Sequence, residues 1–450
     1  MRGFRVPAVA RGVMTRSMPL ARFGRVAGWS VAGALAGRAA ALVSAVLLAR
    51  VLGPARYGEY VLVLATVTSI ASLSTSGLGV AASKYLGDFY GTRAPRRDCG
   101  VLIVMLAALL YAVLAGGLFA IAAPSFAREH FRDENETLVG ALELGALAIL
   151  PAVVQGVVQG TLYGLERFRT NAWISSAGAI SLACTVPLSA WLGGVTGALE
   201  ALLAVTGAWA CYGAWVACAG IGWRDAWHAT WRGPEARRFL AVSTPIVLSA
   251  LTMAPVNWLA LSLLARTPAG FAQIGQYNAA YQWYVGLTFI PTVIAGTVLP
   301  ALSRLRASGD GRGFAMLTRH SILANALIAC ASSLAVWLMA GWMMWLYGPA
   351  YHGAAPLLRW LAFAAAANGL NAAIGQIMTA TNRLWFGLLV NVLWGGIYLS
   401  FAWYQVPRTG ALGLAQGLVL AYVVHTLIHL AFLRLHLRET ASAQHEERPS

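Results

Sequence analysis

The stretch that decides the fold runs from Val101 to Pro124 and reads VLIVMLAALLYAVLAGGLFAIAAP. It carries no charge, and as a helix rising ~1.5 Å per residue it is long enough to cross the ~30 Å hydrocarbon core of a bilayer. Apolar stretches of similar length recur along all 450 residues, of which 59% are hydrophobic and 11% charged. The mean hydropathy of +0.66 is too high for a soluble domain of this length. We therefore expect an all-α polytopic membrane protein.

About twelve apolar spans are separated by charged residues, Pro or Gly-rich turns. Their centres lie near residues 39, 70, 110, 150, 181, 208, 254, 287, 329, 367, 394 and 421. The loops between them are short, which leaves no room for a catalytic domain and argues against an enzyme. Whatever this chain does must take place inside the helix bundle.

The net charge of +16 would suggest nucleic acid as a partner of a soluble domain. Here the basic residues lie between the spans, and no soluble basic domain remains once the spans are removed. With the N-terminus in the cytoplasm, 24 of the 32 basic residues fall on the cytoplasmic side and 6 on the outer side. This asymmetry predicts that both termini are cytoplasmic, and it argues against a nucleic-acid partner.

The spans group into two lobes joined by a polar loop. We expect a basic cytoplasmic arm at 1–26, an N-terminal six-helix lobe at 27–222, a cytoplasmic inter-lobe loop at 223–240, a C-terminal six-helix lobe at 241–433, and a polar cytoplasmic tail at 434–450. The arm has the composition of an organellar transit peptide as well, but a positively charged cytoplasmic arm explains it more simply. The tail lacks the apolar residues needed to pack as a domain and is expected to be disordered.

An internal repeat supports the two lobes. Leu48-Ala49-Arg50 and Gly58-Glu59-Tyr60 in the first half correspond to Leu264-Ala265-Arg266 and Gly275-Gln276-Tyr277 in the second, at offsets of 216 and 217 residues. A unit of six spans is even, so both copies would cross the membrane in the same orientation. Two parallel six-helix lobes around a central cavity indicate a transporter that works by alternating access.

Several stretches resemble oligosaccharide flippases, the Wzx-like polysaccharide transporters of the multidrug/oligosaccharidyl-lipid/polysaccharide exporter superfamily. They are Ala49-Arg50-Val51-Leu52-Gly53-Pro54-Ala55-Arg56-Tyr57-Gly58-Glu59-Tyr60, Thr244-Pro245-Ile246, Gly275-Gln276-Tyr277-Asn278-Ala279-Ala280-Tyr281, Phe289-Ile290-Pro291, Leu299-Pro300-Ala301-Leu302-Ser303-Arg304 and Leu346-Tyr347-Gly348. These motifs are loose and mostly structural, so they identify a family and not a substrate.

The resemblance implies a protein of the bacterial inner membrane without a cofactor. It would carry a polyprenyl-diphosphate-linked oligosaccharide from the cytoplasmic to the outer leaflet for surface polysaccharide synthesis. Its partners would be this lipid-linked oligosaccharide and the membrane lipids, with a polysaccharide polymerase and glycosyltransferases as further candidates. The family often has an acidic residue in the seventh span where this chain has Asn257, so a carboxylate role is not carried over to that position.

Two arginines within spans are candidates for binding the diphosphate. Arg38 lies near the centre of the first span, where a guanidinium facing lipid would cost from ~2.5 to more than ~10 kcal/mol. Its planar set of donors suits a diphosphate, although a structural pair or snorkelling toward the cytoplasm would also explain it. Arg359, about one turn inside the tenth span, could bind a released phosphate, and snorkelling to the interface is slightly favoured.

Other polar residues within spans could bind sugars or ions. Asn257, Gln282 and Asn371 could hydrogen-bond sugar hydroxyls, while amides in membranes more often join helices. Glu143 and Glu200, near the outer ends of the fourth and sixth spans, could couple transport to a proton or sodium ion. A structural role is favoured for both carboxylates.

Aromatic and histidine residues complete the candidates. Sugar rings could stack on Trp258, Trp283, Tyr281 and Tyr284, although packing is their usual role. His425 and His429 are four residues apart, the spacing of two metal ligands on one helix face. No third ligand is evident, so we do not predict a metal site.

Two other functions remain as alternatives. A drug or cation antiporter of the same superfamily would need a functional carboxylate in mid-span, and such residues are sparse. A membrane glycosyltransferase or polymerase would need an acidic residue in a sizeable outer loop. The single lysine, Lys84, follows Ser83, so the chain has no ATP-binding phosphate loop. Energy must then come from an ion gradient, the membrane potential or removal of product.

Overall fold

The computed structural model describes residues 20–72, 77–87, 94–131, 137–219, 221, 253–381 and 383–446. The first half contains helices α1 (Leu20–Ser72), α2 (Gly79–Gly87), α3 (Ala94–Phe131), α4 (Thr137–Gly164) and α5 (Phe168–Cys218). The second contains α8 (Met253–Ala265), α9 (Gly270–Ala307), α10 (Gly311–Trp345), the 3-10 turn η3 (Pro349–Ala354), α11 (Ala355–Ala380), α12 (Leu384–Thr409) and α13 (Ala411–Glu446). Among these residues every regular element is helical, which confirms the predicted fold class.

Two of the helices contain a reversal of direction at a glycine. Gly53 in α1 has φ 73° and Gly194 in α5 has φ 63°, a backbone conformation that only glycine adopts readily. After the reversal at Gly194 the chain folds back closely on itself. A Cβ on Gly197 would collide there with the carbonyl oxygen of Ser189. Each of these helices therefore supplies two spans, and the described elements fit six spans in each half.

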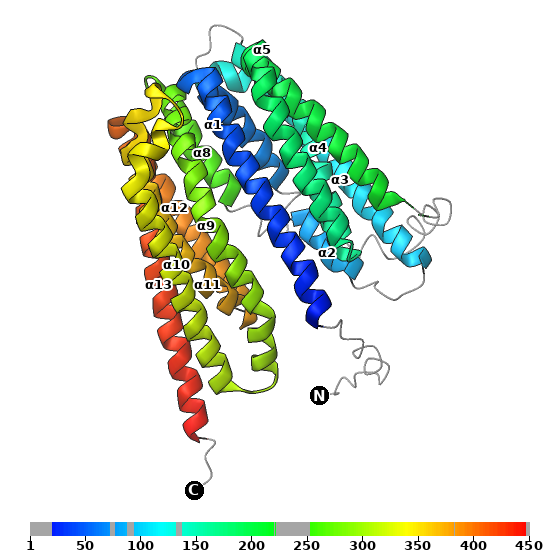
Figure 1. Cartoon of the computed structure of the whole chain (residues 1–450), viewed down its shortest axis with the longest axis vertical. Coiled ribbons are helices and arrows are strands. Elements are labelled where there is room, and N and C mark those ends of the chain that lie inside the picture. Colours follow the sequence, from blue (N-terminus) through cyan, green and yellow to red (C-terminus); the bar gives the residue numbers. More distant parts are fainter. Residues whose placement is uncertain are drawn as a thin grey trace.

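The helices form two lobes, which we call the N-lobe (α1–α5) and the C-lobe (α8–α13) (Figure 1). The first turn of α1 and the last turn of α13 lie at one end of the molecule (Figure 1), here called the terminal end, and the opposite end is called the distal end. Gly53 lies 33 residues after Leu20, or ~50 Å along a helix, at the distal end. α1 of the N-lobe packs extensively on α9 of the C-lobe. Toward the terminal end the two lobes diverge (Figure 1).

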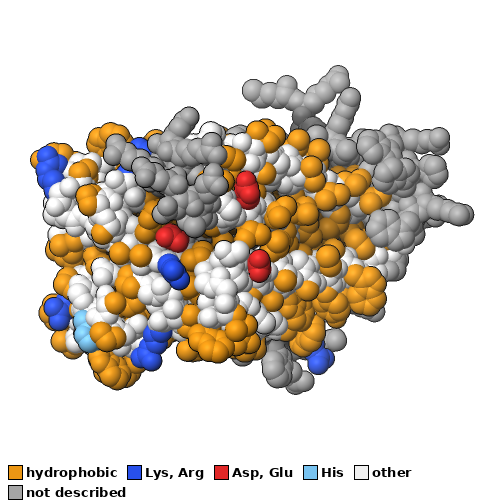
Figure 2. Space-filling view, turned by 90° about the horizontal axis from the view of Figure 1, so that it is seen from above, with side chains coloured by type: hydrophobic (Ala, Val, Ile, Leu, Met, Phe, Trp, Pro, Cys, Tyr) orange, Lys and Arg blue, Asp and Glu red, His pale blue; other side chains and the backbone are white. Residues whose placement is uncertain are grey.

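The outer surface of the bundle is apolar. Eight helical segments of the described residues are long and apolar enough to cross a membrane, including both segments that contain a reversal, and α8 is a shorter apolar helix. Large side chains such as Ile121 and Trp385 are 81% and 82% exposed. Exposed side chains of this kind are suited to contact lipid, so the chain is a multi-pass membrane protein. Figure 2 looks onto the distal end of the molecule, where few charged groups lie among the hydrophobic side chains.

The ends of the chain differ in part from expectation. α1 begins at Leu20, within the predicted arm, and α13 continues to Glu446, within the predicted tail. The expectation of a disordered tail is wrong up to Glu446, because this segment is rich in Leu, Ala, Arg and Glu, which favour helix, and contains no proline before Pro449. The predicted inter-lobe loop at 223–240 lies outside the described residues.

Candidate functional site

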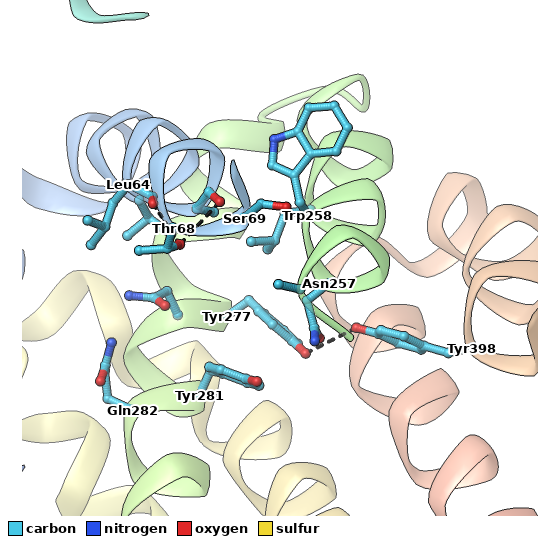
Figure 3. Close-up of a pocket in the computed structure, with 14 residues that line it drawn as sticks. Leu64, Thr68, Ser69, Asn257, Trp258, Tyr277, Tyr281, Gln282 and Tyr398 are labelled. Carbon is cyan, nitrogen blue, oxygen red and sulfur yellow. Dashed lines mark hydrogen bonds between the residues drawn. The ribbon is translucent and has the colours of Figure 1, made fainter. Parts of the chain in front are cut away.

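A cavity of about 290 Å³ lies between the two lobes. Its walls come from the second half of α1 in the N-lobe and from α8, α9 and α12 in the C-lobe (Figure 3). The lining residues are Val61, Leu64, Ala65, Thr68, Ser69, Ala254, Asn257, Trp258, Leu261, Tyr277, Asn278, Tyr281, Gln282 and Tyr398. This set contains hydroxyls, amides and aromatic rings, and it contains no acidic residue.

One face of α9 supplies an aromatic wall. Tyr277, Tyr281 and Tyr284 follow one another at spacings of four and three residues, so their rings lie on the same face of the helix. The ring of Tyr281 stacks on Tyr277 with centroids 5.7 Å apart and on Tyr284 with centroids 5.0 Å apart. The hydroxyls of Tyr277 and Tyr398 are 3.4 Å apart, which ties α9 to α12. Flat aromatic faces beside hydroxyls are well suited to hold a sugar ring.

Amides lie on two sides of this aromatic wall. In Figure 3 the Asn257 side chain is directed toward the hydroxyl ends of Tyr277 and Tyr398, and the Gln282 amide lies on the far side of Tyr281. Gln282 makes no side-chain hydrogen bond within the described part of the chain. Both residues were predicted as sugar-binding amides, and both line the cavity. Their donors and acceptors suit a ligand with many hydroxyl groups.

A hydrogen bond joins the lobes at the roof of the cavity. Trp258 on α8 donates from Nε1 to Oγ1 of Thr66 on α1, at 2.9 Å. Thr66 is buried, and its hydroxyl in turn donates to the carbonyl of Leu62 at 2.8 Å. This interaction fixes the indole of Trp258 against the N-lobe, so its ring is a structural part of the inter-lobe contact as well as a wall of the cavity.

Arg38 lies between the lobes on the terminal side of the cavity. Its guanidinium carbon is 5.8 Å from the ring centroid of Phe289 on α9. It also interacts electrostatically with Tyr281, which lines the cavity about two helical turns before Phe289. The side chain is exposed in the described structure. A positive charge that is free to bind an anion therefore faces the space between the lobes.

The other predicted site residues lie elsewhere. Arg359 is exposed on α11, with its guanidinium carbon 5.4 Å from the ring centroid of Trp337 on α10. Glu143 on α4 and Glu200 on α5 are both exposed. Asn371 is buried inside the C-lobe. None of these four lines the inter-lobe cavity.

At the distal end the lobes are held together by what we call the inter-lobe latch. It consists of Ala49, Arg50, Tyr57 and Gly58 on α1 with Gly275, Asn278, Leu346 and Tyr351 of the C-lobe. Arg50 donates from Nε to the Leu346 carbonyl at 2.6 Å, and the Tyr351 hydroxyl donates to the Ala49 carbonyl at 3.2 Å. These bonds close the distal end of the space between the lobes.

Sequence reasoning missed part of the cavity. Tyr277, Tyr398 and Thr68 line it and were not among the predicted site residues. The spacing of Tyr277, Tyr281 and Tyr284 on one helix face was a usable signal, because such a stripe either packs in a core or faces a cavity. Nothing in the sequence placed Tyr398, more than a hundred residues away, against Tyr277.

Comparisons with known proteins agree with this architecture. A family model described as a polysaccharide biosynthesis protein matches residues 23–306. The EPS I polysaccharide export inner membrane protein EpsE of Ralstonia solanacearum is 29% identical over 406 residues, covering 89% of this chain and 91% of EpsE. The lipid III flippase of Escherichia coli is 23% identical over 409 residues, covering 88% of this chain and 94% of the flippase.

Two solved structures share the fold. An inward-facing multidrug resistance MATE family transporter of the MOP superfamily has a TM-score of 0.76 at 16% identity, covering 90% of this chain and 96% of the transporter. The lipid II flippase MurJ in an inward closed conformation has a TM-score of 0.72 at 13% identity, covering 90% of this chain and 87% of MurJ. At this level of identity the likeness establishes the arrangement of helices.

Proposed function

Because the chain belongs to the polysaccharide biosynthesis protein family, we propose that it moves a polyprenyl-diphosphate-linked oligosaccharide from the cytoplasmic to the outer leaflet of the bacterial inner membrane. The relatives named as a polysaccharide export protein and as a lipid III flippase support this class of substrate. The observation that carries the proposal is the cavity between the lobes, which combines tyrosine rings and amides with Arg38 on its terminal side.

The terminal end is assigned to the cytoplasm by the distribution of basic residues. The latched distal end then faces outward, and the substrate enters from the cytoplasmic side. Arg38 binds the diphosphate, and the sugars lie against Tyr281, Gln282 and Asn257. The polyprenyl tail stays in lipid and passes between the lobes. Opening of the latch and closure around Arg38 would release the head group on the outer side.

The energy source and the further partners belong to the same proposal. Glu143 and Glu200 remain candidates for ion coupling, although both lie outside the cavity. A polysaccharide polymerase would take up the released product, and glycosyltransferases would supply the substrate. The chain itself acts as a transporter and catalyses no covalent step.

Drug antiport is the competing function, because a multidrug transporter shares the fold. A cavity for cationic drugs would place a carboxylate against the ligand. The described cavity wall has no Asp or Glu, and the charged residue beside it is the cation Arg38. This charge favours an anionic head group.

Reconstitution in liposomes tests the proposal. Purified protein is incorporated into vesicles with a fluorescent polyprenyl-diphosphate saccharide, and the fraction of label accessible on the opposite leaflet is followed with time. We expect faster crossing than in protein-free vesicles and no transport of organic cations. Ion-dependent uptake of a small organic cation, together with unchanged crossing of the lipid, would favour the antiporter instead.

A further inference from the structure

A pair of buried histidines lies inside the C-lobe, outside the inter-lobe cavity. His425 and His429 on α13 are 6% and 4% exposed, and their ring centroids are 4.2 Å apart. Nδ1 of each ring is buried without a hydrogen-bond partner in the described structure. A buried polar atom left unpaired costs about 1–3 kcal/mol. Two such atoms side by side are unfavourable for a purely structural core, where apolar side chains would serve better.

A third unpaired polar group lies at the same depth. Asn371 on α11 is 4% exposed, and neither its amide nitrogen nor its amide oxygen has a partner in the described structure. α11 and α13 are in contact and run in the same direction, since α12 returns between them. Asn368 and Tyr422 both bond the Tyr284 hydroxyl. Asn371 follows Asn368 by three positions on α11, and His425 follows Tyr422 by three positions on α13. Asn371 and His425 therefore lie at the same height along the two parallel helices.

The surroundings of the pair are aromatic and uncharged. The Tyr422 ring stacks on His425 with centroids 6.3 Å apart, and Trp394 of α12 packs on Tyr422. The titratable groups that face this region are the hydroxyls of Tyr422 on α13, Tyr284 on α9 and Tyr398 on α12. Within the described structure no acidic or basic side chain acts electrostatically on either imidazole other than its histidine neighbour. There is likewise no group of three or more possible metal ligands among the residues searched.

We propose that His425 and His429 form a proton-binding site in the C-lobe. One proton from the aqueous phase binds Nδ1 of one ring, no other bond is made or broken, and the charge of the pair rises from zero to plus one. Two close imidazoles can hold one proton between them, whereas binding a second would place two charges in the same apolar region.

The pair is connected to the substrate cavity by a continuous set of contacts. His425 stacks on Tyr422, whose hydroxyl accepts a hydrogen bond of 2.9 Å from Tyr284. Tyr284 stacks on Tyr281, which lines the cavity. A charge on the buried pair is costly where it is dry, so a protonated pair favours a conformation in which water reaches it. Proton binding would thereby shift the balance between the two positions of the lobes, and it would drive the transport proposed above.

The first measurement needs no substrate, so it is independent of the proposed transport. The full chain, labelled with ¹⁵N at its eight histidines, is placed in lipid nanodiscs and titrated from about pH 8 to about pH 4, because burial disfavours a charge on either ring. His425→Gln and His429→Gln assign the two buried rings. His352→Gln is the matched control, because His352 is exposed on η3.

We expect one shared protonation step for the two buried rings, altered at the remaining ring when either partner is replaced. Spin labels on the two lobes should report a change of spacing over the same pH range in wild type and His352→Gln, and none in His425→Gln or His429→Gln. Rings that stay neutral throughout, or a lobe spacing that changes equally in all variants, would overturn the proposal.

A second measurement links the site to transport. In liposomes an imposed proton gradient should change the flipping rate of wild type and His352→Gln by about fivefold or more, the lower end of typical coupling between sites. In His425→Gln and His429→Gln the flipping rate should not depend on the gradient. Flipping that responds equally in these variants would reject the coupling, whereas a failure of all proteins to flip would count against the transport function only.

Discussion

Asn278, on α9, donates a hydrogen bond of 2.8 Å from Nδ2 to the hydroxyl of Tyr57, on α1. This bond joins the two lobes beside the cavity, and the tyrosine ring is fully buried. Next to it, a Cβ on Gly58 would collide with the carbonyl oxygen of Phe271. The latch therefore combines a close approach of two backbones with two neutral hydrogen bonds and one from the charged Arg50 guanidinium. Such a contact can be broken in a transport cycle at modest cost, since a neutral bond contributes about 0.5–1.5 kcal/mol and a bond from a charged group about 1.5–3 kcal/mol.

Replacing Tyr57 with Phe should loosen the latch. The change keeps the ring and removes only the acceptor of the Asn278 hydrogen bond, so the distal end should open about two- to tenfold more often. The distance between spin labels at position 56 on α1 and position 352 on η3 measures this opening. Tyr404→Phe is the control, because Tyr404 is exposed on α12. An unchanged distance distribution in Tyr57→Phe would show that this bond does not hold the lobes.

Replacing Gly275 with Ala should separate the lobes more strongly. The added Cβ would collide with the carbonyl oxygen of Pro54, and backbone lies on both sides of the contact. We expect a larger shift toward the open distal end than in Tyr57→Phe, with loss of most flipping. Gly286→Ala on the same helix is the matched control, since no atom lies within 4 Å of the added group. Equal behaviour of the two variants would contradict close packing at Gly275.

The fold could be predicted because a chain that crosses lipid must satisfy its backbone hydrogen bonds internally, which allows few backbone conformations. Uninterrupted apolar stretches such as 101–124 must be helices, and their number and the position of basic residues between them define the bundle. The repeated motifs Gly58-Glu59-Tyr60 and Gly275-Gln276-Tyr277 indicate two related lobes. In the structure both motifs lie in the latch, where glycine allows α1 and α9 to approach.

The site could be predicted only in part. Asn257 and Gln282 could be predicted because an amide within a span is costly unless it meets another polar group or water. Both of them line the cavity. The same rule selected Asn371, which is buried in the C-lobe instead. Hydropathy does not distinguish a polar residue that faces the cavity from one that faces a neighbouring helix. That distinction depends on the rotation of each helix, which tertiary packing sets.

Gln282 should contribute to recognition of the saccharide. Replacing it with Leu keeps the size of the side chain and removes its donors and acceptor, so about one or two hydrogen bonds to sugar hydroxyls would be lost. We expect about five- to thirtyfold weaker binding, at about 1 kcal/mol per bond. Binding of the lipid-linked saccharide to protein in nanodiscs measures the effect. Gln405→Leu on α12 provides the control, because Gln405 lies outside the cavity. Similar losses in both variants would point to general destabilisation.

Arg38 should be the most sensitive single position for the diphosphate. Its guanidinium faces the space between the lobes beside Phe289, and hydrogen bonds to a charged group contribute about 1.5–3 kcal/mol. Arg38→Ala should therefore lower flipping by about ten- to a hundredfold, and Arg38→Lys should restore part of it, because lysine keeps the charge without the paired donors. Arg359→Ala is the matched comparison, since Arg359 lies over Trp337 outside the cavity, and we expect near-normal flipping. A loss confined to Arg359→Ala would move the phosphate site to the exposed face of α11.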